Sequence, residues 1–436
     1  MQVRRSSLAM GLTAAGIGFG ACDVALGSGF QLRENSAAAL GTAFAGAAAS
    51  ADDPSVIVNN PAAIIGLSGN LVSGDISVVV PSLVFSGAGL TTARQPIGGG
   101  NGGDAGDAQP VPAAYGFYDA SPDLKFGLAL SVPFGLGTQY NRGWVGRYQA
   151  IKSEIETINI NPVMAYRIAD WLAIGGGPAI QHLSTELSNA INSTAVARLA
   201  NPLLPAGFSL RDGFARVTGD SLSIGYTLGV LAEISPAIRL GASYRSQISH
   251  TVNGTATFDV PAPLAANLRF QNTPATADLK TPDIVSLAAA YQVSPEVTLL
   301  TEVQWTNWGV VKNLQIARSD GSTISDQQEQ WHGTWFGSVG ATYRPDPQWT
   351  FRGGVAFDPT PIRDAFRTAR LPDTDRYWLA VGLGYTWTDD LRFDAAYVHI
   401  FGSSAPINEV SPTGDRLVGR YSDHIDIVSL SATLRF

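Results

Sequence analysis

The chain has 436 residues, of which 45% are hydrophobic and only 15% are charged, and its net charge is −8. About a quarter of the residues of a soluble globular protein are charged, so the low charge argues against that class, although the mean hydropathy is barely positive. The negative net charge argues against a nucleic-acid-binding protein.

The first 27 residues have the pattern of a secretory signal peptide. Arg4 and Arg5 supply a short positive region, residues 8–21 are apolar and small, and Ala25-Leu26-Gly27 supplies small residues for a signal peptidase. We expect cleavage before Ser28. Beyond it no run reaches the ~18 continuous apolar residues of a membrane helix. An exported chain of this kind can enter a membrane only as a closed barrel, whose strands satisfy each other's backbone groups.

Cys22 is the only cysteine, and it lies in or just past the apolar region of the signal. The mature chain is therefore expected to hold no disulfide bond, although its compartment is oxidising. Residues 19–22 read alternatively as a lipoprotein acylation site, but Phe19 fits the first position of that pattern poorly.

Residues 28–70 do not alternate between apolar and polar side chains. They are rich in Ala and Gly, and Asn59-Asn60-Pro61-Ala62-Ala63 predicts a turn. The rest of the chain predicts a barrel of fourteen strands. A barrel of about eight strands is filled by its own side chains and one of sixteen to eighteen strands leaves a channel, so fourteen strands enclose more space than the wall's side chains fill. We therefore interpret residues 28–70 as a plug inside the barrel.

Residues 71–436 predict an all-β fold, a transmembrane antiparallel barrel of 14 strands. Short turns, each followed by an alternating strand, lie at 121–123, 169–170, 235–236, 294–295, 346–347 and 389–390. Longer Gly-, Asn- and Pro-rich stretches lie at 87–110, 141–151, 189–216, 259–277, 313–327, 360–374 and 403–418. In an outer-membrane barrel the short turns face the periplasm and the long loops face outside. Six turns and seven loops make thirteen connections, hence fourteen strands.

The predicted third strand contains an irregularity. Residues 125–132 read as a strand and are followed by Pro133-Phe134-Gly135-Leu136-Gly137. Proline inside a paired strand removes a ladder hydrogen bond and occurs mainly at edges or bulges. A closed barrel has no edge, so we expect a bulge or an inward kink, after which the polar residues 138–141 continue the strand. The alternative is that the strand ends at Val132 and a loop begins there.

Two of the long loops, 189–216 and 259–277, carry apolar side chains, which are unusual on exposed loops. They predict a hydrophobic surface that captures a ligand. The candidate capture residues are Leu199, Leu203, Phe208, Phe214, Leu264 and Phe270. Residues 193–200 read as a short helix. The alternative is that these loops pack on one another and shut the barrel. A ligand with a carboxylate would also need a basic partner, and Arg167, Arg245, Lys280 and Arg376 are all open candidates.

The last strand alternates strictly and ends on an aromatic residue. Its apolar face consists of Val428, Leu430, Ala432, Leu434 and Phe436. An edge strand of a soluble sheet can alternate too, but a terminal Phe is typical of the closing strand of an outer-membrane barrel. Aromatic residues near strand ends are expected to form an interfacial girdle. They are Tyr166, Trp171, Trp349, Tyr385 and Trp387; ordinary packing explains each of them singly.

No catalytic or metal-binding constellation is visible in the sequence. The five histidines lack metal-ligand spacing, no Gly-x-Ser-x-Gly elbow is present, and no helix follows the glycine-rich tip at 98–103. We expect no metal, no cofactor and no enzymatic activity.

Several motifs resemble those of the FadL/TodX outer-membrane transporters. The motifs that resemble the family's hatch are Ser28-Gly29-Phe30-Gln31-Leu32, Gly41-Thr42-Ala43-Phe44-Ala45-Gly46, Ala51-Asp52-Asp53 and Asn60-Pro61-Ala62. The stretches 354–358 and 372–379, the second containing Asp-Arg-Tyr-Trp, resemble the family too. The resemblance runs from residue 28 to the end. It implies a monomeric barrel with an amino-terminal hatch, in the outer membrane of a Gram-negative bacterium, that passes long-chain fatty acids or aromatic hydrocarbons by diffusion.

The resemblance also implies roles for single residues. Phe30 would touch the ligand at the start of the hatch. The gate and hatch residues would be Asn60, Pro61, Ala62, Pro133, Phe134 and Gly135, with a side exit at the kinked third strand. Asn60-Pro61 alternatively only anchors the hatch to the wall. A sideways exit suits a greasy substrate, because a sixteen-carbon chain loses on the order of 12 kcal/mol on entering water, at ~0.8 kcal/mol per CH₂.

The expected partners are the outer-membrane bilayer with its lipopolysaccharide, a hydrophobic small molecule and, through Phe436, the barrel-assembly machinery. Other functions remain open. A general hydrophilic porin is disfavoured by the plug-like segment and the apolar loops. An outer-membrane lipid hydrolase would need a Ser/His pair facing lipid, and an adhesin would use the long loops.

Overall fold

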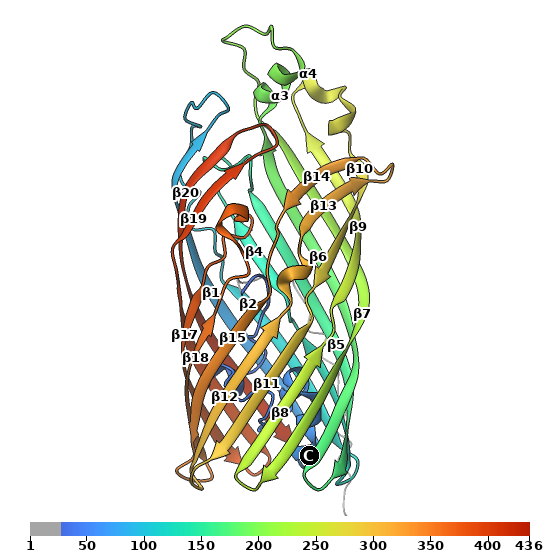
Figure 1. Cartoon of the computed structure of the whole chain (residues 1–436), viewed down its shortest axis with the longest axis vertical. Coiled ribbons are helices and arrows are strands. Elements are labelled where there is room, and N and C mark those ends of the chain that lie inside the picture. Colours follow the sequence, from blue (N-terminus) through green and yellow to red (C-terminus); the bar gives the residue numbers. More distant parts are fainter. Residues whose placement is uncertain (1–27) are drawn as a thin grey trace, which may run out of the picture.

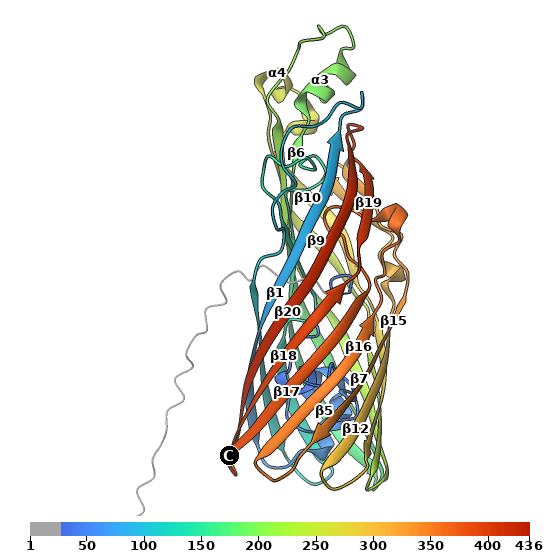
Figure 2. The same cartoon turned by 90° about the vertical axis from the view of Figure 1, so that its left-hand side faces the viewer.

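The structure, a computed structural model, describes residues 28–436. The predicted signal peptide and Cys22 lie outside the described residues. The described chain forms one closed antiparallel β-barrel, in which the first strand, β1 (Leu71–Leu90), pairs along its whole length with the last, β20 (Arg416–Arg435). Figure 2 shows this closure as a blue strand beside a red one.

The barrel has fourteen strands, as the sequence predicts. Eight are continuous: β1, β2 (Gln109–Asp119), β5 (Lys152–Ala169), β6 (Leu172–Ile191), β7 (Gly213–Ser235), β16 (Trp349–Asp358), β17 (Arg376–Thr388) and β20. Six are each built from two segments: β3 (Leu124–Ser131) with β4 (Gly135–Gln139), β8 (Ile238–Arg245) with β9 (Ile248–Asp259), β10 (Thr273–Thr281) with β11 (Ile284–Gln292), β12 (Val297–Thr306) with β13 (Asn313–Arg318), β14 (Thr323–Gln328) with β15 (Thr334–Tyr343), and β18 (Leu391–Gly402) with β19 (Ala405–Val410).

All six predicted short turns are confirmed, and they lie at the end of the barrel that carries the C-terminus (Figure 1). We call this the turn end and the opposite end the loop end. Two predicted loops are wrong: residues 313–327 contain β13 and β14, and residues 403–418 contain β19 and the start of β20. Turn-forming residues dominate these stretches, but their backbones still pair with neighbouring strands, which composition alone does not reveal.

Short helices occur in the loops and inside the barrel. The predicted helix at 193–200 is confirmed as α3 (Ser193–Ala200), and the side chain of Asn192 caps it by accepting from the Ala195 N–H at 3.0 Å. The other loop helices are α4 (Ala262–Ala265), η2 (Leu268–Phe270) and η4 (Asp364–Phe366), whereas η3 (Trp308–Val310) interrupts the strand built from β12 and β13.

No helix in the described part of the chain is long and apolar enough to cross a membrane.

Side chains alternate between the outer face and the lumen along the strands. On β17 the apolar residues Tyr377, Leu379, Val381 and Leu383 are all exposed on the outside. The exposed rings of Trp171, Trp349 and Trp387 lie next to turns at the turn end, as expected for an interfacial girdle.

Residues 28–70, which we call the N-terminal segment, lie inside the barrel toward the turn end, where Figure 1 shows the dark-blue chain within the wall. The segment contains α1 (Ala37–Leu40), α2 (Val56–Asn59) and η1 (Pro61–Gly66). α1 contacts β17 and β18, and η1 contacts β5, β6 and β7. Nearly all of its residues before Leu67 are buried.

Glycines in the wall let the N-terminal segment approach closely. A Cβ atom at Gly354 would lie 2.1 Å from the Thr42 carbonyl oxygen, and one at Gly229 would lie 1.9 Å from Asn60 Oδ1. Other wall glycines in such close contact with the segment are Gly127, Gly175, Gly241, Gly340 and Gly382. The segment is therefore docked against backbone on several sides of the lumen.

Candidate functional site

The barrel wall is incomplete at its third strand. β3 pairs with both β2 and β5, whereas β4 pairs only with β5. The β2–β3 ladder ends at the pair Ala114–Leu130, so residues 109–113 of β2 have ladder partners only on β1. Pairing with β5 resumes at Gly135 after a one-residue shift in register. The third strand is thus kinked at 132–134 and does not end at Val132.

The kink is joined to the start of the N-terminal segment. The Leu32 N–H donates to the Pro133 carbonyl at 2.9 Å, and the Gly135 N–H donates to the Phe30 carbonyl at 2.8 Å. These bonds replace part of the pairing that the third strand lost toward β2. The first residues of the N-terminal segment therefore lie like a short strand against the kink.

Four buried aromatic rings meet at this junction. The ring of Phe30 lies 5.7 Å from that of Phe134, 4.8 Å from Trp308 and 5.8 Å from Trp331, measured between centroids. Gly29 has φ +59°, and a Cβ there would lie 2.8 Å from the Trp308 ring, so both its conformation and its contact favour glycine. We call these four rings the aromatic cluster.

Residues 359–375, the inner loop between β16 and β17, contact both parts of the junction. Asp373 accepts a hydrogen bond from the Gly29 N–H at 3.0 Å. On β4 the Thr138 hydroxyl donates to the Arg370 carbonyl at 2.9 Å, and just after β4 the Tyr140 hydroxyl donates to the Ala369 carbonyl at 2.8 Å. Burial raises the pKa of Asp373, and the neighbouring Arg376 guanidinium opposes that rise.

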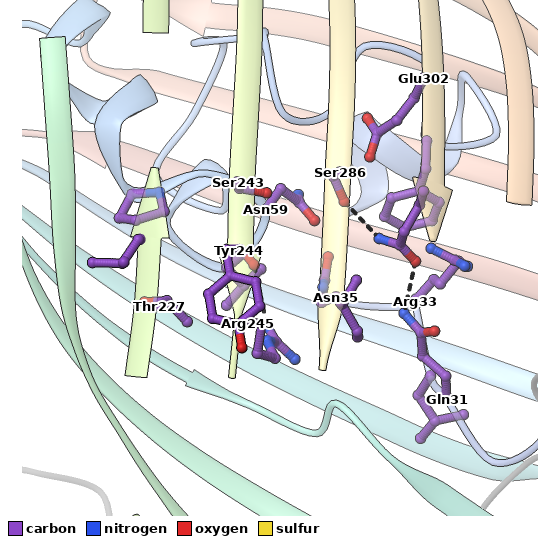
Figure 3. Close-up of a pocket in the computed structure, with 17 residues that line it drawn as sticks. Gln31, Arg33, Asn35, Asn59, Thr227, Ser243, Tyr244, Arg245, Ser286 and Glu302 are labelled. Carbon is purple, nitrogen blue, oxygen red and sulfur yellow. Dashed lines mark hydrogen bonds between the residues drawn. The ribbon is translucent and has the colours of Figure 1, made fainter. Parts of the chain in front are cut away.

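The lumen contains an apolar and a polar chamber. The apolar chamber, with about 490 Å³ of empty space, is nearer the loop end and is lined mainly by Ile155, Leu187, Val217, Val252, Leu279 and Ile316. The polar chamber, with about 570 Å³, lies between the N-terminal segment and strands β7, β8, β11 and β12 (Figure 3). Its charged lining residues are Arg33, Arg245 and Glu302.

A belt of buried polar side chains separates the two chambers. Gln181 Oε1 lies 2.8 Å from His250 Nε2 and accepts from the Thr281 hydroxyl at 3.3 Å, while Gln181 Nε2 donates to Asn159 Oδ1 at 2.7 Å. Along the seventh strand, His250 comes between Arg245 of the polar chamber and Val252 of the apolar chamber. A molecule that moved down the lumen would pass from apolar to polar walls.

The predicted capture residues do not converge on one site. Leu199 and Leu203 are 71% and 92% exposed at the loop end. Phe214 lies under the Arg142 guanidinium at 5.0 Å, Phe270 packs edge-on against Phe258, and Leu264 is buried. Phe208 is half-buried. Neither cavity is lined by any of the predicted capture residues.

Sequence reasoning missed the residues that line the apolar chamber. The signal that would have found them is an apolar side chain, such as Leu187, Val217 or Val252, on the face of a strand that otherwise turns polar residues to the lumen. All three lie in segments that the sequence predicts as strands, since the predicted loops nearest to them span residues 189–216 and 259–277.

Asn60 ties the N-terminal segment to the wall. Its amide group donates to the Ala48 carbonyl at 2.7 Å and to the Val230 carbonyl of β7 at 2.9 Å, and its Oδ1 accepts from the Ala62 N–H at 3.0 Å. Pro61 and Ala62 pack directly on Gly175 of β6. These contacts hold the Asn-Pro-Ala stretch against the wall.

Residues 20–436 match the model of the family described as outer membrane protein transport protein (OMPP1/FadL/TodX). The chain is 30% identical to a putative outer membrane protein of Neisseria meningitidis serogroup B, across 94% of this chain and 95% of that protein. It is 25% identical to the long-chain fatty acid transport protein of Escherichia coli, across 88% and 90% of the two chains.

The fold is similar to that of a solved structure as well. The crystal structure of a Pseudomonas aeruginosa FadL homologue has a TM-score of 0.88 and 27% identity, across 93% of this chain and 99% of that one. The family match covers both the N-terminal segment and the barrel. This chain therefore belongs to the OMPP1/FadL/TodX family of outer membrane transport proteins.

Proposed function

We propose that this protein takes up long-chain fatty acids or other hydrophobic compounds by passive diffusion across the outer membrane of a Gram-negative bacterium. The observation that carries the proposal is the missing β2–β4 ladder beside the aromatic cluster, in a barrel whose turn end is filled by the N-terminal segment. A hydrophobic molecule in the lumen could leave sideways at the kink, whereas the N-terminal segment blocks the way to the turn end.

The route begins at the loop end. The exposed leucines Leu199, Leu203 and Leu268 give the loops an apolar surface that can collect substrate, with Phe208, Phe214, Leu264 and Phe270 behind it. From the loops the substrate enters the apolar chamber. From there the substrate reaches the aromatic cluster and leaves through the kink formed by Pro133, Phe134 and Gly135 into the bilayer, without the cost of entering water.

The protein works as a monomer without a cofactor and without catalysis. Its outer surface contacts the bilayer and lipopolysaccharide, and Phe436 serves recognition by the barrel-assembly machinery. Asn60, Pro61 and Ala62 hold the N-terminal segment in place while the start of that segment moves with the kink.

Growth of a deletion strain tests the function directly. The strain carries the wild-type gene, the Leu199→Ser/Leu203→Ser variant, the loop control Ala206→Ser or no gene, and grows on fatty acids, alkanes or aromatic hydrocarbons as sole carbon source. We expect wild type and Ala206→Ser to restore growth on at least one class. The double variant should take up limiting substrate several-fold more slowly, because the apolar area that a bound substrate would cover on these exposed leucines contributes about 25 cal/mol per Å². Equal growth of all four strains on every compound contradicts the proposal, as do large steady ion currents through purified wild-type protein.

Phe30→Ala is expected to weaken ligand binding while the barrel keeps its stability. Truncating a ring in a packed cluster costs about 3–5 kcal/mol, and here that loss falls on the junction between the N-terminal segment and the kink. The closed ladder of fourteen strands does not depend on Phe30, so heat resistance should be unchanged. Binding is measured by ligand titration, with Phe30→Leu as the control of nearly conserved bulk. Unchanged affinity in Phe30→Ala would remove Phe30 from the proposed site.

A further inference from the structure

We propose that the polar chamber is a headgroup site that binds the carboxylate of an amphiphilic acid, with Arg245 and Thr227 as its anchoring pair. The inference rests on the proposed transport function and adds a second binding site to it, distinct from the apolar chamber and from the kink. It also assigns the substrate class as a long-chain acid in place of a bare hydrocarbon.

Of the basic residues that the sequence leaves open as carboxylate partners, only Arg245 faces a cavity. Arg167 lies at the turn end and is paired with a glutamate of β7 at 3.1 Å. Lys280 is exposed on the outer face. Arg376 is buried and forms an ion pair with an aspartate of the inner loop. Arg245, by contrast, lines the polar chamber and keeps part of its surface uncovered.

The Arg245 guanidinium has room for an anionic partner. Its single hydrogen bond in the structure runs from Nη2 to the Val58 carbonyl at 3.1 Å. Among residues 28–436, no carboxylate forms an ion pair with it. A guanidinium removed from water without an opposite charge is costly, so the site is completed when an anion enters.

The charges that line the chamber leave a positive excess. Arg33 and Arg245 face one carboxylate, Glu302. Glu302 is already held, because its Oε2 accepts from the Ala48 N–H at 3.1 Å. Arg33 stacks on the Phe336 ring at 3.9 Å and is buried under the influence of three carboxylates, Asp358, Glu302 and Glu34. Arg245 is therefore the cation that remains for a ligand.

A free hydroxyl stands next to this guanidinium. Thr227 of β7 is the direct cross-strand partner of Arg245 of β8, and both side chains line the chamber. Thr227 Oγ1 is buried and has no hydrogen-bond partner among the described residues. A hydroxyl donor and a guanidinium side by side match the two oxygens of a carboxylate.

The rest of the lining fits an acid with an attached chain. Gln304 Nε2 donates to the Ser286 hydroxyl at 2.8 Å, and Gln31 Nε2 donates to Gln304 Oε1 at 3.1 Å, as the dashed lines in Figure 3 show. Gln31 directly follows Phe30 of the aromatic cluster. Leu32, Phe44 and Ile284 supply apolar walls for the first methylene groups. The acid would therefore sit with its head at Arg245 and its tail toward the aromatic cluster.

The test compares a long-chain fatty acid with its methyl ester and with the alkane of equal length, each titrated into purified full-length protein. Wild type should bind the acid about 10- to 100-fold more tightly than the ester, the range expected for a hydrogen-bonded charge. Arg245→Met should lose this preference while its ester affinity stays unchanged, which shows that the protein is still folded. Thr227→Val should lose part of the preference. Arg239→Met, on the same strand and the same face but outside the chamber, should keep it.

The outcomes separate this inference from the transport proposal. Ester and alkane that bind and are taken up as well as the acid, or an Arg245→Met protein that keeps the full preference for the acid, would overturn the headgroup site alone. If acid, ester and alkane all fail to bind wild-type protein, the transport proposal itself is overturned.

Discussion

Gly354→Ala is expected to turn a closed channel into one that conducts ions. The new Cβ atom would lie 2.1 Å from the Thr42 carbonyl oxygen, and the collision is with backbone that cannot rotate away. Overpacking of this kind costs about 1–3 kcal/mol, and displacement of the N-terminal segment relieves it. The conductance should rise by about an order of magnitude or more, because a fourteen-strand lumen without its plug approaches the width of a porin.

Planar-bilayer recordings measure this effect. Gly353→Ala is the matched control, because it lies next to Gly354 on β16 and its Cβ would meet only the Ala380 carbonyl oxygen at an ordinary 3.9 Å. Gly229→Ala, which would collide with Asn60 on the far side of the segment, should conduct like Gly354→Ala. If both variants fold normally and conduct no ions, the close contact between the N-terminal segment and the wall is not needed to keep the channel closed.

Pro133→Val/Gly135→Val is expected to abolish most uptake of a long-chain substrate. Valine suits a strand, whereas proline removes a ladder bond and glycine weakens pairing. The repaired strand can pair with residues 109–113 of β2, which have no partner on that side. Each new ladder bond contributes about 1 kcal/mol, so several together should hold the gap shut and reduce uptake at least about tenfold.

Uptake is measured in whole cells, together with the surface amount and heat resistance of the barrel, which should stay normal or improve. Pro162→Val provides the control, since Pro162 faces outward on the continuous strand β5 and its replacement leaves the kink intact. Wild-type uptake through a strand verified to be straight would mean that substrate leaves by another route, and the sideways exit would be wrong for this protein.

The fold was predictable because its signals are local. A strand in a barrel turns one face to lipid and one to the lumen, so alternation appears within each strand, and the tight turns carry Pro and Asp in the sequence. All six turns and the fourteen strands follow from these patterns. The kink was predictable for the same reason, because Pro133 cannot donate a ladder bond. Loop boundaries were harder to predict, since β13, β14 and β19 pair without a strong alternating pattern.

The sequence alone therefore determined the barrel, its strand number, the irregular third strand and the family resemblance. Only the tertiary structure decided which side chains meet inside the lumen. Phe30 and Trp308 lie 278 positions apart in the sequence, and yet their rings are 4.8 Å apart. Thr227 faces Arg245 because β7 and β8 pair in one of the several registers that a turn of this kind permits. Lumen contacts join a segment without periodicity to strands from every part of the chain. Their pairing is fixed by closure of the barrel, which no local pattern encodes.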